Sequence, residues 1–290
     1  MSTAVPLSRQ FVSISRAYQT EDLALGEAWQ SLAGGERKGW RDLLAQFRVV
    51  ILAEAGAGKT YELMAAARKL SEEGCPAFFI RIEDIDVNFE NAFETGDEAA
   101  FRDWLAGSEE AWFFLDSVDE VRLGNPRAFE DAIRAFGAKI RDARQRAHVV
   151  ISSRPYAWRS ALDRALIEEV LPFASSDTKA EAGDDSEEGA TVTVSQVKSE
   201  DGTPVELYFL APLNDADISL FSEHRGVTDT GLFLDAVKRG ALMPLAQRPF
   251  DLQELVESWT ARGVFGSRLE VLQTSIGHHL GALSFGLLRR

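Results

Sequence analysis

The stretch that decides the fold is RVVILAEAGAGKT, residues 48–60. Its apolar run, residues 49–52, predicts a short buried strand, and residues 61–70 have apolar side chains at helical spacing. A strand, a glycine loop and a helix in this order are the context that a phosphate-binding loop requires. Backbone N–H groups of such a loop surround phosphate oxygens, and the helix N-terminus adds a favourable field.

The loop therefore predicts a nucleotide site. Lys59 would reach the β- and γ-phosphates, and the Thr60 hydroxyl would ligate Mg²⁺. The sequence departs from the usual pattern at its first position, where Ala53 replaces glycine, and a chance glycine-rich turn before a helix is the alternative. The residues expected to bind the nucleotide from this loop are Ala55, Gly56, Ala57, Gly58, Lys59 and Thr60.

Composition indicates a packed globular protein, since 45% of the residues are hydrophobic and 10% are aromatic. The net charge of -15 argues against nonspecific binding to nucleic acid or to an anionic membrane. The single cysteine excludes an internal disulfide and a cysteine zinc cluster. Neither a signal peptide nor an apolar run of about 20 residues is visible, so a cytoplasmic protein without a membrane partner is expected.

Strands alternate with helices over residues 46–213, which predicts an α/β core with a parallel sheet and helices on both faces. Residues 83–96 are polar and predict a loop. Asn125 and Pro126 are expected to cap and open another helix, with four apolar side chains at spacings of four, three and four. The expected strands are 49–52, 77–82, 111–116, 205–210 and one that begins with 148–151 and ends in residues 152–155. The expected helices include 61–70 and 97–105.

Three further segments surround this core. Residues 1–45 are expected to form an N-terminal helical arm, with an extended start and helices over 20–32 and 36–46. An acidic insertion, residues 173–203, is expected to be a solvated loop that ends in a hairpin strand, 191–197. Residues 214–290 have only helical patterns and predict a small helical lid domain, with its last helix over 269–280.

A second motif, FFLDSVDE, occupies residues 113–120. Its apolar strand would deliver Asp116 to the edge of the sheet beside the phosphate loop, where the carboxylate can hold Mg²⁺ through its water shell. Asp119 and Glu120 follow one short turn later and could orient or deprotonate an attacking water. The alternative is that both residues cap the next helix or lie in solvent.

Taken together, these segments resemble the NACHT branch of the signal-transduction ATPases with numerous domains (STAND), which are relatives of the AAA+ ATPases. The resemblance covers about residues 40–280, and Asp116-Ser117-Val118-Asp119 with Glu120 is its most specific part. It is carried by AEAGAGKT (53–60), FFLDSVDE (113–120), VVISSRP (149–155), YFLAPL (208–213) and AQRPFDL (246–252).

The resemblance implies a P-loop NTPase fold of the AAA+/STAND type, with ATP or ADP and Mg²⁺ as cofactors. It implies that Arg154 is a sensor of the γ-phosphate and that Pro249 lies against the adenine. A surface arginine before a proline is the alternative for Arg154. The family continues into a winged-helix module, and the sequence stops at Arg290, so a truncated or minimal member is expected.

The predicted function is that of an ATP-binding, slowly ATP-hydrolysing switch in a bacterial signalling or antiviral defence system, with self-association or protein partners on activation. A nucleotide-binding scaffold without hydrolysis, or an inactive fragment of such a switch, is the alternative. An enzyme acting on nucleic acid is disfavoured by the acidic charge. The trigger, the effector, the oligomeric state, and the choice between Asp119 and Glu120 as the base stay open.

Overall fold

The computed structural model describes residues 5, 7–14, 35–125, 127–173 and 205–265. The predicted helices over 20–32 and 269–280, the hairpin strand 191–197 and all but the first residue of the acidic insertion lie outside these residues. In the described part, no helix is long and apolar enough to cross a membrane.

The described residues form one eight-stranded sheet in the order β2-β1-β8-β3-β7-β6-β4-β5. The five strands from β8 to β4 are parallel, and β1, β2 and β5 pair antiparallel at the two edges. The predicted parallel core sheet is therefore confirmed. The strands are β1 Phe11–Ser13, β2 Arg37–Lys38, β3 Arg48–Leu52, β4 Ala77–Arg81, β5 Phe93–Thr95, β6 Ala111–Asp116, β7 Ala147–Ser153 and β8 Glu206–Leu210.

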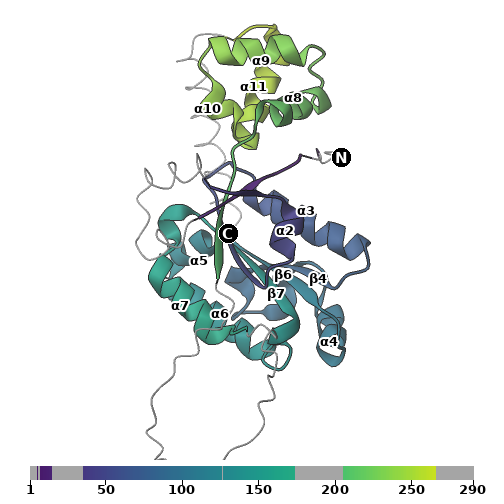
Figure 1. Ribbon diagram of the computed structural model, residues 1–290, viewed down its shortest axis with the longest axis vertical. Helices are drawn as coiled ribbons and strands as arrows, with labels where there is room; N and C mark the ends of the chain where they lie inside the picture. The colour runs from purple at the N-terminus through teal and green to yellow at the C-terminus, as the bar shows by residue number, and fades with distance from the viewer. Residues whose placement is uncertain (1–4, 6, 15–34, 126, 174–204, 266–290) are drawn as a thin grey trace, which may run out of the picture.

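Helices cover both faces of this sheet, as the alternating pattern predicts (Figure 1). α2 and α3 pack on one face, and α4 to α7 pack on the other. The α-helices of the core are α2 Trp40–Leu44, α3 Lys59–Glu72, α4 Glu98–Ala106, α5 Val118–Gly124, α6 Ala128–Lys139 and α7 Ser160–Val170. Short 3₁₀ helices are η2 Ile82–Asp84, η3 Phe89–Ala92, η4 Arg144–Arg146 and η5 Pro155–Ala157.

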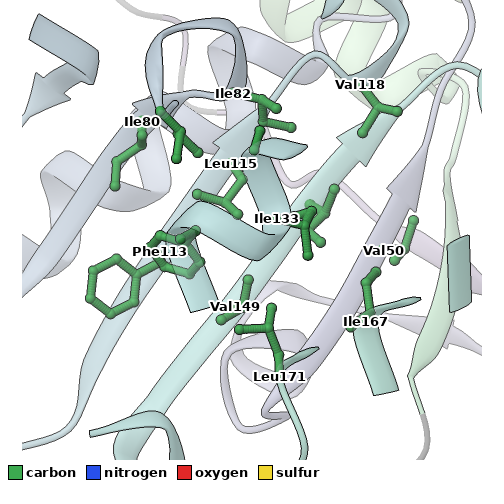
Figure 2. Packing of buried hydrophobic residues seen from close by; sticks show 14 of the residues in the cluster. Val50, Ile80, Ile82, Phe113, Leu115, Val118, Ile133, Val149, Ile167 and Leu171 are labelled. Atoms are coloured by element: carbon green, nitrogen blue, oxygen red, sulfur yellow. The ribbon is translucent and has the colours of Figure 1, made fainter. Parts of the chain in front are cut away.

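The central strands β3, β6 and β7 are apolar over most of their length because both of their faces are covered, and their polar residues lie at or next to the strand ends. In β3, Val50 lies in the same apolar cluster as Phe113 and Ile133, and Figure 2 shows these side chains in that layer. The alternate residue Ile51 belongs to the cluster on the opposite face, with Leu63 of α3. Burial of both layers fixes the register of β3, because a shift by one residue would exchange its two faces.

Residues 214–265 form a helical unit with an apolar core of its own (Figure 1). Asn214 begins it as predicted, because its side chain accepts a hydrogen bond from the N–H of Asp217 at 2.9 Å. Ile218 and Phe233 are fully buried in its core, which also includes Val5 from the N-terminal segment. Its helices are α8 Asp215–His224, α9 Thr230–Arg239, α10 Met243–Ala246 and α11 Pro249–Arg262.

The prediction of an N-terminal helical arm is wrong for the described part of residues 1–45. β1 pairs antiparallel with β8, and β2 pairs with β1, so this segment extends the sheet by two strands. Phe11 and Val12 of β1 are fully buried. The helix predicted over 36–46 is reduced to α2, because residues 37–38 are taken up by β2. The structure of this segment depends on its pairing with β8, a strand far away in the sequence. Such pairing is not visible in the local spacing of apolar residues.

The loop predicted over residues 83–96 is also corrected. It contains η3 and the edge strand β5, which pairs antiparallel with β4 and shifts its register at Phe79 and Ile80. The helices α5, α7 and α10 were not predicted from the sequence. α5 and α10 span seven and four residues, which is too short for a periodic signal.

A buried arginine holds the amino end of β3. The guanidinium of Arg48 donates to the carbonyl groups of Phe47 at 2.7 Å, Arg144 at 2.9 Å, Ala147 at 2.5 Å and Leu171 at 2.8 Å. Burial, with a smaller effect of the charge on Arg144, lowers the pKa of Arg48 to about 10. One side chain thus joins β3 to the segments that enter β7 and leave α7.

We expect Arg48→Met to lower the free energy of unfolding by about 3 kcal/mol, because buried carbonyl groups would lose their donors. Urea unfolding would measure the change. The matched control is Arg134→Met, which removes an exposed arginine on α6 and should shift the urea midpoint little. Equal midpoints for the two variants would contradict the expectation.

Candidate functional site

The loop between β3 and α3 has the geometry of a phosphate-binding loop. Gly56 and Gly58 have left-handed φ angles of 75° and 88°, and Gly58 caps the N-terminus of α3. A Cβ atom at Gly56 would lie 3.3 Å from Cβ of Phe250, and one at Gly58 would lie 3.5 Å from Cγ of Pro249. The backbone conformation favours glycine at both positions, and the close approach of the helical unit adds to this at Gly56.

The alanine at the first position of the motif fits this loop. Ala53 is buried, and its N–H donates to the carbonyl of Ser153 at 3.1 Å. Among the described residues other than glycine, only Ser117 and Ala241 have a positive φ. Position 53 therefore does not use the conformation for which glycine is favoured, and the methyl group is accommodated in the core.

A cleft of about 710 Å³ lies between this loop and the helical unit. Phe221 and Arg225 of the helical unit contribute to its far side. Ala57 does not line it; its carbonyl instead accepts a hydrogen bond from Arg9 at 3.2 Å. Eight of the predicted site residues line the cleft: Ala55, Gly56, Gly58, Lys59, Thr60, Glu120, Arg154 and Pro249.

A smaller cavity of about 180 Å³ shares part of this lining. Thr60, Met64 and Glu120 line both spaces, so the two meet at these side chains. Asp116, the predicted metal residue, lines only the smaller cavity. The structure thus brings Thr60 and Asp116 to one cavity beside the phosphate loop.

The carboxylate of Asp119 lies between two cations. Its side chain is 1% exposed, Oδ1 lies 3.3 Å from Nζ of Lys59, and Oδ2 lies 2.8 Å from Nε of Arg154. These are ion pairs without hydrogen-bond alignment, since Oδ1 of Asp119 and Nε of Arg154 have no hydrogen-bond partner. Asp119 lines neither cavity, so it connects α3, α5 and the end of β7 from behind the cleft.

The end of β7 also supplies a residue that the sequence did not reveal. The Ser152 hydroxyl donates to Oδ1 of Asp116, and its oxygen accepts a hydrogen bond from the N–H of Ser117 at 3.1 Å. β7 lies between β3 and β6 in the sheet, which places this serine beside the Asp116 carboxylate. Only the position of β7 in the sheet identifies Ser152, because a serine at a strand end is not distinctive in a sequence.

Glu120 differs from Asp119 in its surroundings. Its side chain is exposed to both cavities. Partial burial raises the pKa of Glu120, the negative charge of Asp119 raises it further, and Lys59 opposes the shift. Of the two carboxylates, Glu120 is the one that can meet a water or ligand in the cleft.

The oxygen groups around the smaller cavity fit a magnesium ion bound with a nucleotide. No group of three or more His, Cys, Asp or Glu side chains in the described residues could hold a metal alone. Mg²⁺ in nucleotide sites usually has one or two carboxylates, and phosphates and waters complete its shell. The Thr60 hydroxyl with the Asp116 carboxylate provides a donor set of this kind.

A buried arginine from the N-terminal segment, Arg9, supports the loop, and no sequence pattern predicts this role. Besides its bond to Ala57, Nη2 of Arg9 donates to the carbonyl of Ala211 at 3.0 Å. Burial lowers the pKa of Arg9, and the charges of Glu62 and Asp217 oppose this. Arg9 therefore ties the phosphate loop to the segment between β8 and the helical unit.

The helical unit contacts the loop directly. The N–H of Phe250, in the first turn of α11, donates to the carbonyl of Gly56 at 3.3 Å. Pro249 begins the same helix and lies against Gly58. The position of α11 and the conformation of the loop therefore depend on each other.

Comparison with known proteins gives little further information. No protein-family model matches the sequence, and no curated protein matches it. Among solved structures, a Walker-type ATPase of Pyrococcus abyssi is similar with a TM-score of 0.46 and 14% sequence identity, over 86% of this chain and 73% of that one. A similarity at this level does not assign a function.

We expect Glu120→Gln to raise the melting temperature at pH 7. The pKa of Glu120 is raised in the folded state, so the folded protein binds the proton more tightly than the unfolded chain does. Stability is then lost as the pH rises from the ordinary glutamate pKa, about 4.3, through the raised value. Thermal unfolding of parent and variant at pH 4 and pH 7 would test this. The same difference in melting temperature at both pH values would contradict the expectation.

Proposed function

We propose that this protein binds ATP with Mg²⁺ and hydrolyses it slowly. The observation that carries the proposal is the convergence of Lys59, Glu120 and Arg154 on one cleft, behind a loop with two left-handed glycines. Backbone N–H groups at a helix N-terminus, together with a lysine, form a site for phosphate oxygens.

In this proposal the loop and Lys59 bind the phosphates, and Thr60 and Asp116 hold the metal. Mg²⁺, when bound, neutralises charge on the phosphate oxygens. The Ser152 hydroxyl keeps Asp116 in place through its hydrogen bond to Oδ1. Arg154 stabilises the negative charge that develops during phosphoryl transfer, which is the usual role of a cation at that position.

The surroundings of the two adjacent carboxylates support Glu120 as the group that orients and deprotonates the attacking water. Asp119 is shared between Lys59 and Arg154 and lines neither cavity. Its role in the proposal is to hold these two cations at a fixed separation. Glu120 lines the cleft, and a raised pKa makes its carboxylate a stronger base.

We further propose that the helical unit acts as a lid, as the resemblance to NACHT ATPases implies. Its contact with Gly56 through the N–H of Phe250 gives a direct route by which the phosphate loop could bias the position of α11. A protein of this kind would work as a nucleotide-dependent switch in bacterial signalling or defence, with self-association or a protein partner as its output.

A scaffold that binds ATP without hydrolysing it is the second candidate. It is favoured by one observation: Asp119 already neutralises both Lys59 and Arg154, the cations that would act on the phosphates. Turnover separates the two candidates, because both of them bind ATP.

We expect Lys59→Ala to abolish detectable ATP binding in titration calorimetry while circular dichroism stays unchanged. The lysine provides a point charge for the phosphates, and it lies at the start of α3, where alanine is a good helix former. The matched control is Lys69→Ala, an exposed lysine on the same helix, and it should bind ATP like the parent. Equal affinities of the two variants would contradict the assignment of the loop.

We expect Glu120→Gln to bind ATP like the parent and to reduce single-turnover hydrolysis by about 10²–10⁴-fold, because a positioned base is lost. Asp119→Asn should in addition change ATP affinity, since Lys59 and Arg154 lose their shared partner. Glu73→Gln, at the exposed end of α3, is the control. If both Glu120→Gln and Asp119→Asn hydrolyse ATP at the parent rate, the scaffold replaces the ATPase.

A further inference from the structure

We infer that the buried pair of Arg122 and Asp163 is a positioning element that fixes Glu120 relative to Arg154. The inference rests on the proposed function, because it concerns the geometry of the proposed reaction. Neither Arg122 nor Asp163 lines the cleft or the smaller cavity. Their effect on the chemistry would therefore pass through the residues that do.

Asp163, on α7, is a buried carboxylate with several donors. Its side chain is 1% exposed, and Oδ1 lies 2.5 Å from Nη2 of Arg122. Oδ2 accepts the N–H of Arg159 at 2.7 Å, and Oδ1 also accepts from the Arg159 side chain at 3.2 and 3.3 Å. A buried carboxylate with this many partners is held in one orientation, and loss of a partner would leave buried charge uncompensated.

Arg122 uses its planar guanidinium to contact two elements at once. While Nη2 meets Asp163, Nη1 donates to the carbonyl of Ala157 in η5. The guanidinium also lies 4.9 Å from the centre of the Phe129 ring, and the side chain is 11% exposed. A lysine would have to make both contacts from one nitrogen, whereas the guanidinium makes them from two nitrogens held in a fixed planar geometry.

These contacts connect two segments that carry site residues. Arg122 lies two residues after Glu120 on α5. Ala157 ends η5, the turn that directly follows Arg154, and its N–H donates to the Arg154 carbonyl at 3.0 Å. The path from Glu120 through Arg122 and Ala157 to Arg154 thus consists of one short helix, one guanidinium and one short turn.

α5 needs such an attachment. It has seven residues, follows Ser117 with a positive φ, and has no side-chain cap at its N-terminus. A helix of two turns has little stability of its own, so tertiary contacts must hold it. Asp119 attaches its first turn to Lys59 and Arg154, and Arg122 attaches its second turn to Ala157 and Asp163.

The test compares binding with chemistry in Asp163→Asn and Arg122→Lys. Both variants should keep ATP affinity within about twofold of the parent. Their single-turnover rate of hydrolysis should fall about 10–10²-fold, because a small misplacement of the reacting groups slows the reaction by about this factor. The matched control is Glu169→Gln, also on α7, which removes an exposed ion pair with Arg134 at 2.8 Å. It should leave both quantities unchanged.

Hydrogen exchange of residues 118–124 gives a readout that does not depend on activity. Exchange in α5 should be faster in Asp163→Asn and Arg122→Lys than in the parent and in Glu169→Gln. If exchange rises but the parent itself does not hydrolyse ATP, the proposed function fails and the positioning contact stands. A lowered melting temperature with parental hydrolysis and parental exchange in α5 would overturn the inference. Should Asp163→Asn fail to fold, Arg122→Lys alone decides between these outcomes.

Discussion

The ion pairs of the buried Asp119 carboxylate are the interaction on which the rest of the site depends. An isolated charge in a protein interior is strongly unfavourable, so this carboxylate requires Lys59 and Arg154 beside it. The three residues come from α5, from the start of α3 and from the end of β7. Each of these elements is thereby fixed in relation to the other two, and the cleft takes its shape from them.

The strand order makes this arrangement possible. β3, β7 and β6 are adjacent and parallel, so their carboxyl ends meet at one edge of the sheet. Ligands of open α/β sheets bind at that edge because loops from neighbouring strands converge there. β7 contributes Ser152 from its central position, and Arg154 directly follows the strand. Arg9 and Phe250 contact the loop from outside the sheet.

The predictable features were those encoded by short-range patterns. Apolar spacing together with residues of a known local role identifies the phosphate loop, the strand before Asp116 and the helix cap at Asn214. β1 was missed because its partner β8 is about 200 residues away, and Arg9 was missed for the same reason, since it bonds Ala211. β5 was missed although its partner β4 is close in the sequence, because three residues are too few for a periodic signal. Ser152, Arg122 and Asp163 depend on the order of strands and on helix packing, which no window of sequence reports.

Several residues beside the cleft have features that usually lower the stability of a folded protein. Ser117 has a left-handed backbone, Glu120 has a raised pKa, and Asp119 and Arg154 have buried atoms without aligned hydrogen bonds. Arg48 at the opposite end of β3 differs, since each of its three side-chain nitrogens donates a hydrogen bond to a backbone carbonyl. Strain and unmet hydrogen bonding tend to persist where a ligand or a reaction requires them. Such features also occur away from the cleft, at Ala241, Thr95 and Ser160. Those at Asp119, Glu120 and Arg154 therefore support the proposed nucleotide site only together with the geometry of the loop.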